Sequence, residues 1–362
     1  MNTLANETKT RPAPKAKQID ICYDRRYYTA FPQVVRLEGD ELLIAFRQAP
    51  REERVRHTHP RSIITVMRSY DAGSTWDAVG ASQLAAGGGQ EFGPLYLGRG
   101  RVVGALAWHE VVPLREEKRS GFLHFYPHEY PFRTPGTYWA WSENYGLTWP
   151  PHQVSLIRPD AMPCAPPIRL ADGRFLCPAY SWEPGSNLMS ALFFTSRDDG
   201  RSWSDAVVMA QGSEQVGSFC EPMVIELEPG HLLALHRVEG GPAEPAACFR
   251  RNESFDGGRT WSEPVNTGIL SGACPRLLKL RDGRLLLTYG RRAEPFGIRA
   301  RLSDDGGRSW GETAWILRKG RNGDLGYTSS VELADGEIFT ATYMQNARGT
   351  TGIVGTFWRV PS

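Results

Sequence analysis

Charged and aromatic residues stand where the apolar segments of this chain begin or end, and these residues could do chemistry. A carboxylate beside a phenol can take its proton and make it a nucleophile, because the ordinary pKa of tyrosine is near ~10. Arginine grips a carboxylate ligand through two parallel hydrogen bonds. The residues at segment starts are Glu91, Glu221, Arg276 and Tyr327, and those at segment ends are Arg47, His109, Arg237, Arg291 and Arg292. Together they predict a site that binds an anion and moves a proton.

Five turns with the pattern Ser-x-Asp-x-Gly-x-Thr/Ser-Trp lie between these segments. An Asp or Asn side chain can accept hydrogen bonds from the backbone of its own turn, and Gly accepts a positive φ. The Trp adds a large apolar face that covers a hairpin. The copies begin at Ser69, Ser142, Ser196, Ser254 and Ser303, and the second has Asn144 at the Asp position.

A second repeat, an apolar run, a Gly turn and another apolar run, alternates with the first. Its six copies span residues 34–44, 95–103, 170–176, 227–233, 280–286 and 333–339. Each copy predicts a β-hairpin. Six units of two hairpins predict an all-β chain folded as one six-bladed β-propeller domain over residues 18–362. The last unit lacks a strand, and we expect residues 18–23 to complete it and close the ring. An irregular β-sandwich is the alternative.

The order of the turns predicts where the chemistry-bearing residues meet. Successive turns of a meander alternate between two faces, so the Gly hairpins and the Ser/Asp turns share one face. The starts of the innermost strands and the ends of the second strands share the other. Residues there ring the central axis, where a propeller is concave and binds ligands. The alternative interpretation is a polar mouth without function.

The Ser/Asp turns are Asp-boxes, and across nearly its whole length the chain resembles the sialidase (neuraminidase) superfamily. Tyr327, in Asp324-Leu-Gly-Tyr-Thr-Ser-Ser330, resembles the tyrosine nucleophile of that family. Glu221, in Cys220-Glu-Pro-Met223, is similar to the glutamate that activates the tyrosine. Arg237 is similar to one arginine of the triad that binds the substrate carboxylate. The resemblance implies a glycosidase that acts on a terminal acidic sugar, either sialic acid or a related ulosonate or uronate. The box alone does not decide function, because non-enzymatic receptors also carry it.

The chain departs from this family in its arginines. Thr29-Ala-Phe-Pro32 stands where the family has its first arginine, and we expect Arg47, on the other side of the same hairpin, to replace it. Either Arg291 or Arg292 is expected to be the third arginine. Arg299 and Arg301 are further candidates.

The family's proton donor is an aspartate on the loop after the first hairpin, and here that place has none. His59 or His57 is expected to serve instead, because imidazole titrates near ~6.5 and both gives and accepts protons. Alternatively, these histidines bind a metal ion with His109 and Glu91, or the loop is simply solvated. We expect no cofactor and no metal in the leading interpretation.

The longest insertion, residues 111–135, is rich in aromatic residues. It is expected to be either a lid over the site or a subunit contact that makes a homo-oligomer.

Composition narrows the class of protein. Of 362 residues, 42 are Lys or Arg and 40 are Asp or Glu, a net charge of +2 that does not favour a nucleic-acid binder. No apolar run is long enough to span a membrane. Residues 1–17 are expected to be a disordered tail without a signal peptide, and six scattered cysteines favour a reducing compartment, so we expect a cytoplasmic protein.

Three functions remain, all with carbohydrate or a glycoconjugate as partner. The first is a sialidase-like glycoside hydrolase. The second is a lyase that removes a proton beside a uronate carboxylate, and the third is a non-catalytic carbohydrate-binding propeller.

Overall fold

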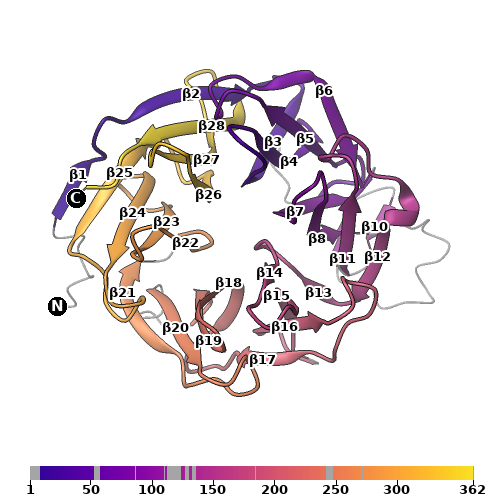
Figure 1. The fold of residues 1–362 in the computed structure, drawn as a ribbon, viewed down its shortest axis with the longest axis vertical. Coiled ribbons are helices and arrows are strands. Elements are labelled where there is room, and N and C mark those ends of the chain that lie inside the picture. Colours follow the sequence, from indigo (N-terminus) through magenta and orange to yellow (C-terminus); the bar gives the residue numbers. More distant parts are fainter. Residues whose placement is uncertain are drawn as a thin grey trace.

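Six sheets surround a central axis, each sheet being one blade of a propeller, as Figure 1 shows, and the pairing within them is antiparallel except at β1 (Lys9–Pro12), described below. The computed structural model describes residues 9–52, 58–85, 87–109, 111, 124–126, 130–132, 136–183, 185–241, 248–270 and 272–361. The predicted all-β, six-bladed propeller is confirmed. Within the described residues the one helical segment is the short 3-10 turn η2 (Pro151–Gln153).

Each blade consists of strands paired in sequence order from the axis outward. Blades one to three contain β3 (Tyr27–Arg36), β4 (Leu42–Pro50), β5 (Ile63–Ser69) and β6 (Asp77–Leu84); β7 (Gly89–Tyr96), β8 (Val102–Trp108), β11 (Gly136–Ser142) and β12 (Val154–Arg158); and β13 (Ala161–Met162), β14 (Ile168–Arg169), β15 (Phe175–Trp182), β16 (Met189–Ser196) and β17 (Val207–Ala210). In blade three both β13 and β14 pair with β15.

Blades four to six follow the same plan. They contain β18 (Ser218–Glu228), β19 (His231–Glu239), β20 (Cys248–Ser254) and β21 (Val265–Leu270); β22 (Arg276–Lys279), β23 (Leu285–Arg291), β24 (Gly297–Ser303) and β25 (Thr313–Lys319); and β26 (Leu325–Glu332), β27 (Ile338–Gln345), β28 (Thr351–Trp358) and β2 (Lys17–Cys22).

The ring closes as predicted, because β2 pairs antiparallel with β28 and completes blade six. The expectation of a disordered tail to residue 17 is wrong for the part that the structure describes. Strand β1 (Lys9–Pro12) pairs in parallel with β25 at the outer edge of blade five. An edge strand offers unpaired backbone groups to any neighbouring segment. All four residues of β1 are exposed, so no apolar pattern in the sequence announced the strand.

The five Asp-boxes share one set of hydrogen bonds, as the first box shows. The hydroxyl of Ser69 accepts the Gly73 N–H at 2.8 Å, and Oδ1 of Asp71 accepts the Thr75 N–H at 2.8 Å. The boxes beginning at Ser142, Ser196, Ser254 and Ser303 repeat both bonds. The turn is therefore held by its own side chains.

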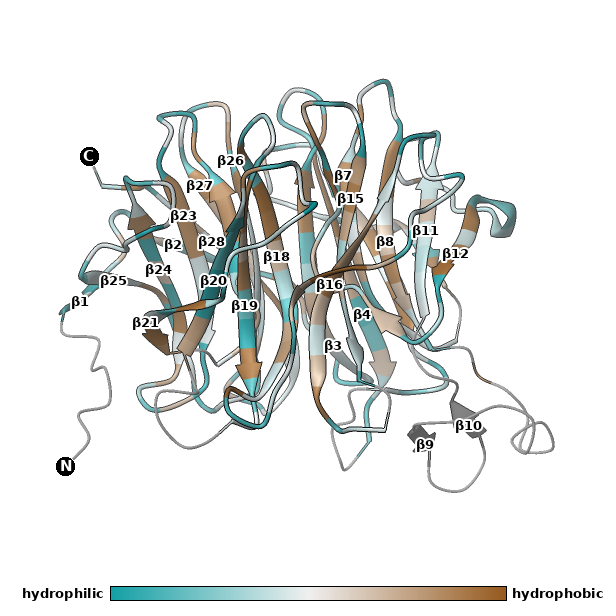
Figure 2. Cartoon of the chain, turned by 90° about the horizontal axis from the view of Figure 1, so that it is seen from below, coloured by the Kyte–Doolittle hydropathy of each residue, from teal (hydrophilic) through white to brown (hydrophobic). Residues whose placement is uncertain are grey.

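The tryptophans of the boxes join neighbouring blades. Trp203 of blade three packs on Trp139 of blade two with ring centroids 5.0 Å apart, and Trp76 of blade one lies 5.9 Å from Phe339 of blade six. Figure 2 shows the strands side by side around the disc, with most of their hydrophobic residues between the two faces. This packing holds the innermost strands at fixed distances from the axis, which is what positions the site.

Candidate active site

Tyr327 and Glu221 meet at the axis although they come from different blades. Tyr327 lies on β26 of blade six and Glu221 on β18 of blade four, and the phenol O–H donates a hydrogen bond to Oε1 of Glu221. Tyr327 is 7% exposed and Glu221 is 6% exposed. The two groups therefore interact in a small region almost closed to water.

The backbone is strained where these side chains leave it. Phe31, Glu221 and Tyr327 have φ values of 59°, 49° and 51°, a region that residues other than glycine seldom adopt. In each case the pairing register slips, and a bulge of this kind re-aims a side chain. Strain of this type costs roughly 1–3 kcal/mol per residue and persists where the surroundings enforce it. Phe31 packs on the Tyr327 ring at 4.6 Å, so the three strained positions support one cluster.

The second oxygen of Glu221 accepts two more hydrogen bonds. Nη1 of Arg237 donates to Oε2 at 2.8 Å, and Sγ of Cys274 donates to the same atom at 2.9 Å. Burial by itself would raise the pKa of Glu221. The positive charge of Arg237 and the hydrogen bonds that the carboxylate accepts outweigh burial and lower the pKa to about 2. Glu221 is therefore an ionised acceptor that keeps Oε1 for the phenol.

Tyr327 carries the proton that the pair shares. Burial, and then the negative charge of Glu221, raise the pKa of Tyr327 well above its ordinary value. The cations Arg237 and Arg292 oppose this rise, and the Arg292 guanidinium lies 5.5 Å from the centre of the Tyr327 ring. The resting pair is a neutral phenol on a carboxylate, with two cations near the oxygen that would become charged.

Arg291 is the last residue of β23 and Arg292 follows it, and of the two it is Arg292 that joins this cluster. Its Nη2 donates to the Tyr343 hydroxyl at 2.8 Å, and its Nε donates to the Leu325 carbonyl at 2.9 Å. Arg291 instead donates through Nη2 to the carbonyl of Glu294 at 2.9 Å, in its own loop. Arg292, and not Arg291, is therefore the candidate for the third arginine, because it bonds Leu325 on β26, the strand that carries Tyr327.

Arg47, which we expected to touch the substrate, lies beneath the surface of the site. It has no exposed surface, and its guanidinium lies 5.9 Å from the ring centre of Tyr28. The hydroxyl of Tyr28 donates to Asp324 at 2.8 Å. Burial lowers the pKa of Arg47 to about 10. The structure thus differs from the expectation: Arg47 supports the wall of the site instead of lining it.

His59 is buried, and it pairs with a carboxylate that the sequence analysis did not single out. The Arg61 N–H donates to Nδ1 of His59 at 3.0 Å, which leaves the ring proton on Nε2. Nε2 lies 3.0 Å from Oε1 of Glu52, whose side chain is 33% exposed. Burial, with the nearby charges of Arg47 and Arg61, lowers the pKa of His59 although Glu52 opposes it. His57 lies outside the described residues.

Glu91 and Arg276 form a second buried pair at the blade starts. Nη2 of Arg276 lies 3.1 Å from Oε1 of Glu91, and Nε2 of Gln33 donates to the same oxygen at 2.8 Å. Both members of the pair are 4% exposed. Burial raises the pKa of Glu91 to about 8, because desolvation outweighs the opposing charge of Arg276. Neither residue presents an open surface to a ligand.

The candidate metal ligands are not gathered into one cluster. Among the described residues no group of three or more His, Cys, Asp and Glu side chains is arranged to hold an ion. His109 is 3% exposed at the end of β8, Glu91 is paired with Arg276, and His59 is bonded to Glu52.

Comparison with known proteins decides the family. The model of the BNR repeat-like domain matches residues 114–340, well over half of the chain. The chain belongs to the BNR repeat-like domain family. No curated protein matches it.

Solved structures show the same propeller. A protein of unknown function from Dyadobacter fermentans is 24% identical, with 96% of this chain and 100% of that chain covered and a TM-score of 0.81. A Hadza microbial sialidase is 20% identical, with 92% and 66% covered and a TM-score of 0.66. An α-L-arabinofuranosidase from Fusarium graminearum is 13% identical, with 94% and 97% covered and a TM-score of 0.65. The predicted sialidase-like Asp-box propeller is confirmed, and these low identities agree with the predicted divergence from true sialidases.

This BNR repeat-like domain thus has a glycoside hydrolase-like fold. In its described part no helix is long and apolar enough to cross a membrane. Most of the aromatic insertion lies outside the described residues, so its expected role as a lid or subunit contact stays a prediction. What the structure describes there includes β9 (His124–Tyr126) and β10 (Tyr130–Phe132), paired antiparallel.

Two contributors to the site of this domain had weak signals in the sequence. Glu52 stands in Arg51-Glu-Glu-Arg54, which looks like an ordinary charged loop, and only its contact with His59 distinguishes it. Cys274 stands at a blade start, as Cys164 and Cys220 do, and no motif in the sequence assigns it a role. In the structure its thiol bonds Glu221, and a further hydrogen bond joins it to Cys164.

Proposed function

We propose that this protein is a sialidase-like glycoside hydrolase that acts on a terminal acidic sugar, with Tyr327 as nucleophile and Glu221 as its base. The observation that carries the proposal is the hydrogen bond between these two side chains across the axis, flanked by Arg237 and Arg292. Tyr28 also bonds a carboxylate, that of Asp324. The Tyr327–Glu221 pair differs because Arg237 bonds the same carboxylate and the Arg292 guanidinium lies over the same ring.

The first step forms a bond between the Tyr327 oxygen and the anomeric carbon while the glycosidic bond breaks. The phenol becomes acidic as its oxygen forms that bond, so its proton passes to Oε1 of Glu221 in the same step. Glu221 is a weak base at rest because its pKa is about 2, so complete transfer before attack is unfavourable. A neutral nucleophile also avoids repulsion from an acidic sugar. Water then attacks the anomeric carbon of the glycosyl-tyrosine and gives a proton to the group that protonated the leaving group, while Glu221 returns its own proton to the phenol oxygen as the sugar–tyrosine bond breaks.

We place the proton donor for the leaving group on the pair of Glu52 and His59. Glu52 is the member with exposed surface, and His59 orients it through Nε2. The positive charge of Arg47 is near enough to lower the pKa of His59, and the Arg47 guanidinium lies 5.9 Å from the ring centre of Tyr28 in the same blade. Both groups therefore lie on the blade-one side of the site.

The cations favour an acidic sugar over a neutral one. Arg237 and Arg292 flank the Tyr327 oxygen, and guanidinium groups bind carboxylates through paired hydrogen bonds. With Arg47 buried, we propose that two arginines hold the substrate carboxylate, where the resemblance implied three.

The test is to trap the intermediate. A panel of aryl glycosides of sialic acid, other ulosonates and uronates is first screened for a substrate. The fluorinated glycosyl fluoride of the sugar that reacts should then leave one glycosyl group on Tyr327, which mass spectrometry detects. Tyr327→Phe should lose the label and at least about a thousandfold in kcat. Full turnover by Tyr327→Phe contradicts the mechanism.

The alternatives give different products. An unsaturated product that absorbs in the near ultraviolet, without oxygen from water, indicates the lyase. Tight binding without turnover across the panel indicates a carbohydrate-binding propeller. Glu52→Gln should slow substrates with alkyl leaving groups far more than aryl glycosides, because only a basic leaving group needs the donated proton.

A further inference from the structure

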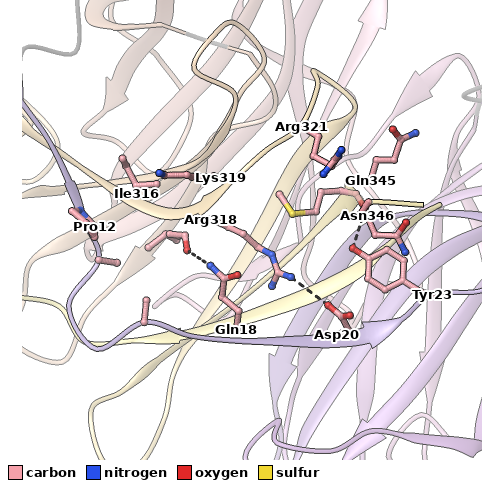
Figure 3. A pocket seen from close by; sticks show the side chains of 15 residues that line it. Pro12, Gln18, Asp20, Tyr23, Ile316, Arg318, Lys319, Arg321, Gln345 and Asn346 are labelled. Carbon is pink, nitrogen blue, oxygen red and sulfur yellow. Dashed lines mark hydrogen bonds and ion pairs between the residues drawn. The ribbon is translucent and has the colours of Figure 1, made fainter. Parts of the chain in front are cut away.

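A groove lies between blades five and six, away from the Tyr327–Glu221 pair, and the N-terminal segment forms one of its walls. Its volume is about 560 Å³, within the range typical of small-molecule sites. Strand β1 pairs with β25 of blade five and β2 pairs with β28 of blade six, so the residues between them bridge the two blades. Figure 3 shows Pro12 and Gln18 on this side and Lys319 and Arg321 across the groove.

The groove is cationic. Arg318, Lys319 and Arg321 line it, and Asp20 is the carboxylate among its lining residues. Arg318 already has partners, because it lies 3.3 Å from Asp20 and donates to the carbonyls of Ile19 and Gly355. Lys319 and Arg321 are exposed, and no hydrogen bond or ion pair joins their side chains to the described residues. Two positive charges are thus available to a ligand.

The end of β27 contributes neutral hydrogen-bonding groups to the groove, close to Arg321. Oε1 of Gln345 accepts from Asn322 at 2.8 Å, and Oδ1 of Asn346 accepts the Thr350 N–H at 3.0 Å. Their amide N–H₂ groups have no partner within the described part of the chain, and Tyr23 adds an aromatic ring beside them. Amides that both donate and accept suit the hydroxyl groups of a sugar, whereas a phosphate backbone is bound by an extended basic surface.

The groove is connected to the segment that carries Tyr327. Asn322, which bonds Gln345, also accepts the Asp324 N–H at 3.1 Å. Asp324 in turn accepts from Tyr28 at 2.8 Å and from Thr351 at 3.0 Å. The short segment from Arg321 to Tyr327 therefore links the groove to the strand that carries Tyr327.

We propose that this groove binds a negatively charged stretch of a glycan, with Lys319 and Arg321 holding its carboxylate or sulfate groups. The assignment goes beyond the proposed function, because it concerns a second site that binds without reacting. A chain of acidic sugars is the occupant that matches two free cations, two free amides and a volume of this size.

The experiment measures binding of four probes to the full chain: oligogalacturonate, colominic acid, neutral dextran and a short DNA duplex. The variant Lys319→Glu/Arg321→Glu reverses the two free charges. Arg197→Glu/Arg201→Glu is the matched control, since it changes net charge equally at exposed positions on the Asp-box face. We expect the groove variant to weaken binding of an anionic glycan at least tenfold, the control to weaken it less than twofold, and dextran not to bind.

Three outcomes overturn the proposal: no anionic glycan binds, both charge-reversal variants lose binding equally, or DNA binds the groove more tightly than the glycans. The result is separable from the axial mechanism. Tyr327→Phe should keep groove binding, and the groove variant should keep full activity on a small aryl glycoside. If Tyr327→Phe abolishes glycan binding, the ligand occupies the axial site and the groove assignment is wrong.

Discussion

On the face that carries the Asp-boxes, Ser, Asp or Asn, and Gly recur in five blades with the same hydrogen bonds. On the opposite face the charged and aromatic residues at the blade starts differ from blade to blade. The box carboxylates sit in exposed turns and accept bonds from their own backbone, as Asp305 does from Ser309 at 2.9 Å. Glu221 instead accepts bonds from Tyr327, Arg237 and Cys274, which belong to blade six, the end of β19 and the start of blade five. The repeated box residues stabilise turns that every blade needs in order to fold. The strained backbone and buried charges around Glu221 occur at one place in the molecule, which is typical of a functional site.

The largest difference in kcat should appear between two variants in which a carboxylate becomes an amide, one on each face of the propeller. Glu221→Gln removes the acceptor of the Tyr327 proton, and we expect kcat to fall by about a hundredfold to ten-thousandfold. Asp305→Asn should keep full activity and most of its stability, because Asn144 already occupies that position in the second box. Steady-state kinetics and thermal melting measure both. Equal kcat for the two variants would remove the distinction between the faces.

The next prediction concerns neighbouring arginines. Arg292→Lys keeps a positive charge but loses the guanidinium that bonds both Tyr343 and Leu325 and that could grip a carboxylate with two donors, so kcat/KM should fall roughly tenfold to a hundredfold on an acidic substrate. Arg291→Lys should change it less than twofold, because Arg291 bonds within its own loop. A larger effect at Arg291 would assign the substrate carboxylate to that residue.

The buried Glu91–Arg276 pair should make the stability of the protein depend on pH. Burial raises the pKa of Glu91 to about 8, against roughly 4.3 in an unfolded chain. The folded state therefore favours the neutral acid. Its contribution to stability is complete below the unfolded pKa and is lost as the pH rises through about 8.

Glu91→Gln stays neutral at all pH values. Its free energy of unfolding, relative to that of the unchanged chain, should rise between pH 5 and pH 8.5 by on the order of 1 kcal/mol or more. Denaturant unfolding at several pH values measures the difference. A difference that does not change with pH would show that Arg276 keeps Glu91 ionised throughout.

The smallest expected effect is at Cys274. Its thiol stabilises the ionised form of Glu221, so Cys274→Ala should raise the Glu221 pKa. The acidic limb of the kcat/KM profile should then move to higher pH by less than about one unit, since one hydrogen bond contributes about 1 kcal/mol. Cys274→Ser keeps a donor and should restore the original limb. A shift of the same size in both variants would trace the effect to packing.

Some parts of this site were predictable because motifs and spacing carry them. Tyr327 and Glu221 stand in short motifs at strand starts, and the turn order alone places both on one face. Other parts had no local signal. The choice of Arg292 over Arg291 depends on strand geometry at the end of β23, and the position of Arg47, buried beside the Tyr28 ring, depends on how the blades pack.

The sequence by itself determined the number of blades, the closure of the ring by a strand predicted at residues 18–23 and found at Lys17–Cys22, and the face on which the chemistry lies. Those features rest on repeated local patterns, in which each turn and strand is specified by residues a few positions apart. Only the tertiary structure decided that Cys274 bonds Glu221, that Glu52 meets His59 and that residues 9–12 extend blade five. Each of these contacts joins segments whose local sequences do not share a repeat. They form only when the blades have packed against one another and the ring has closed.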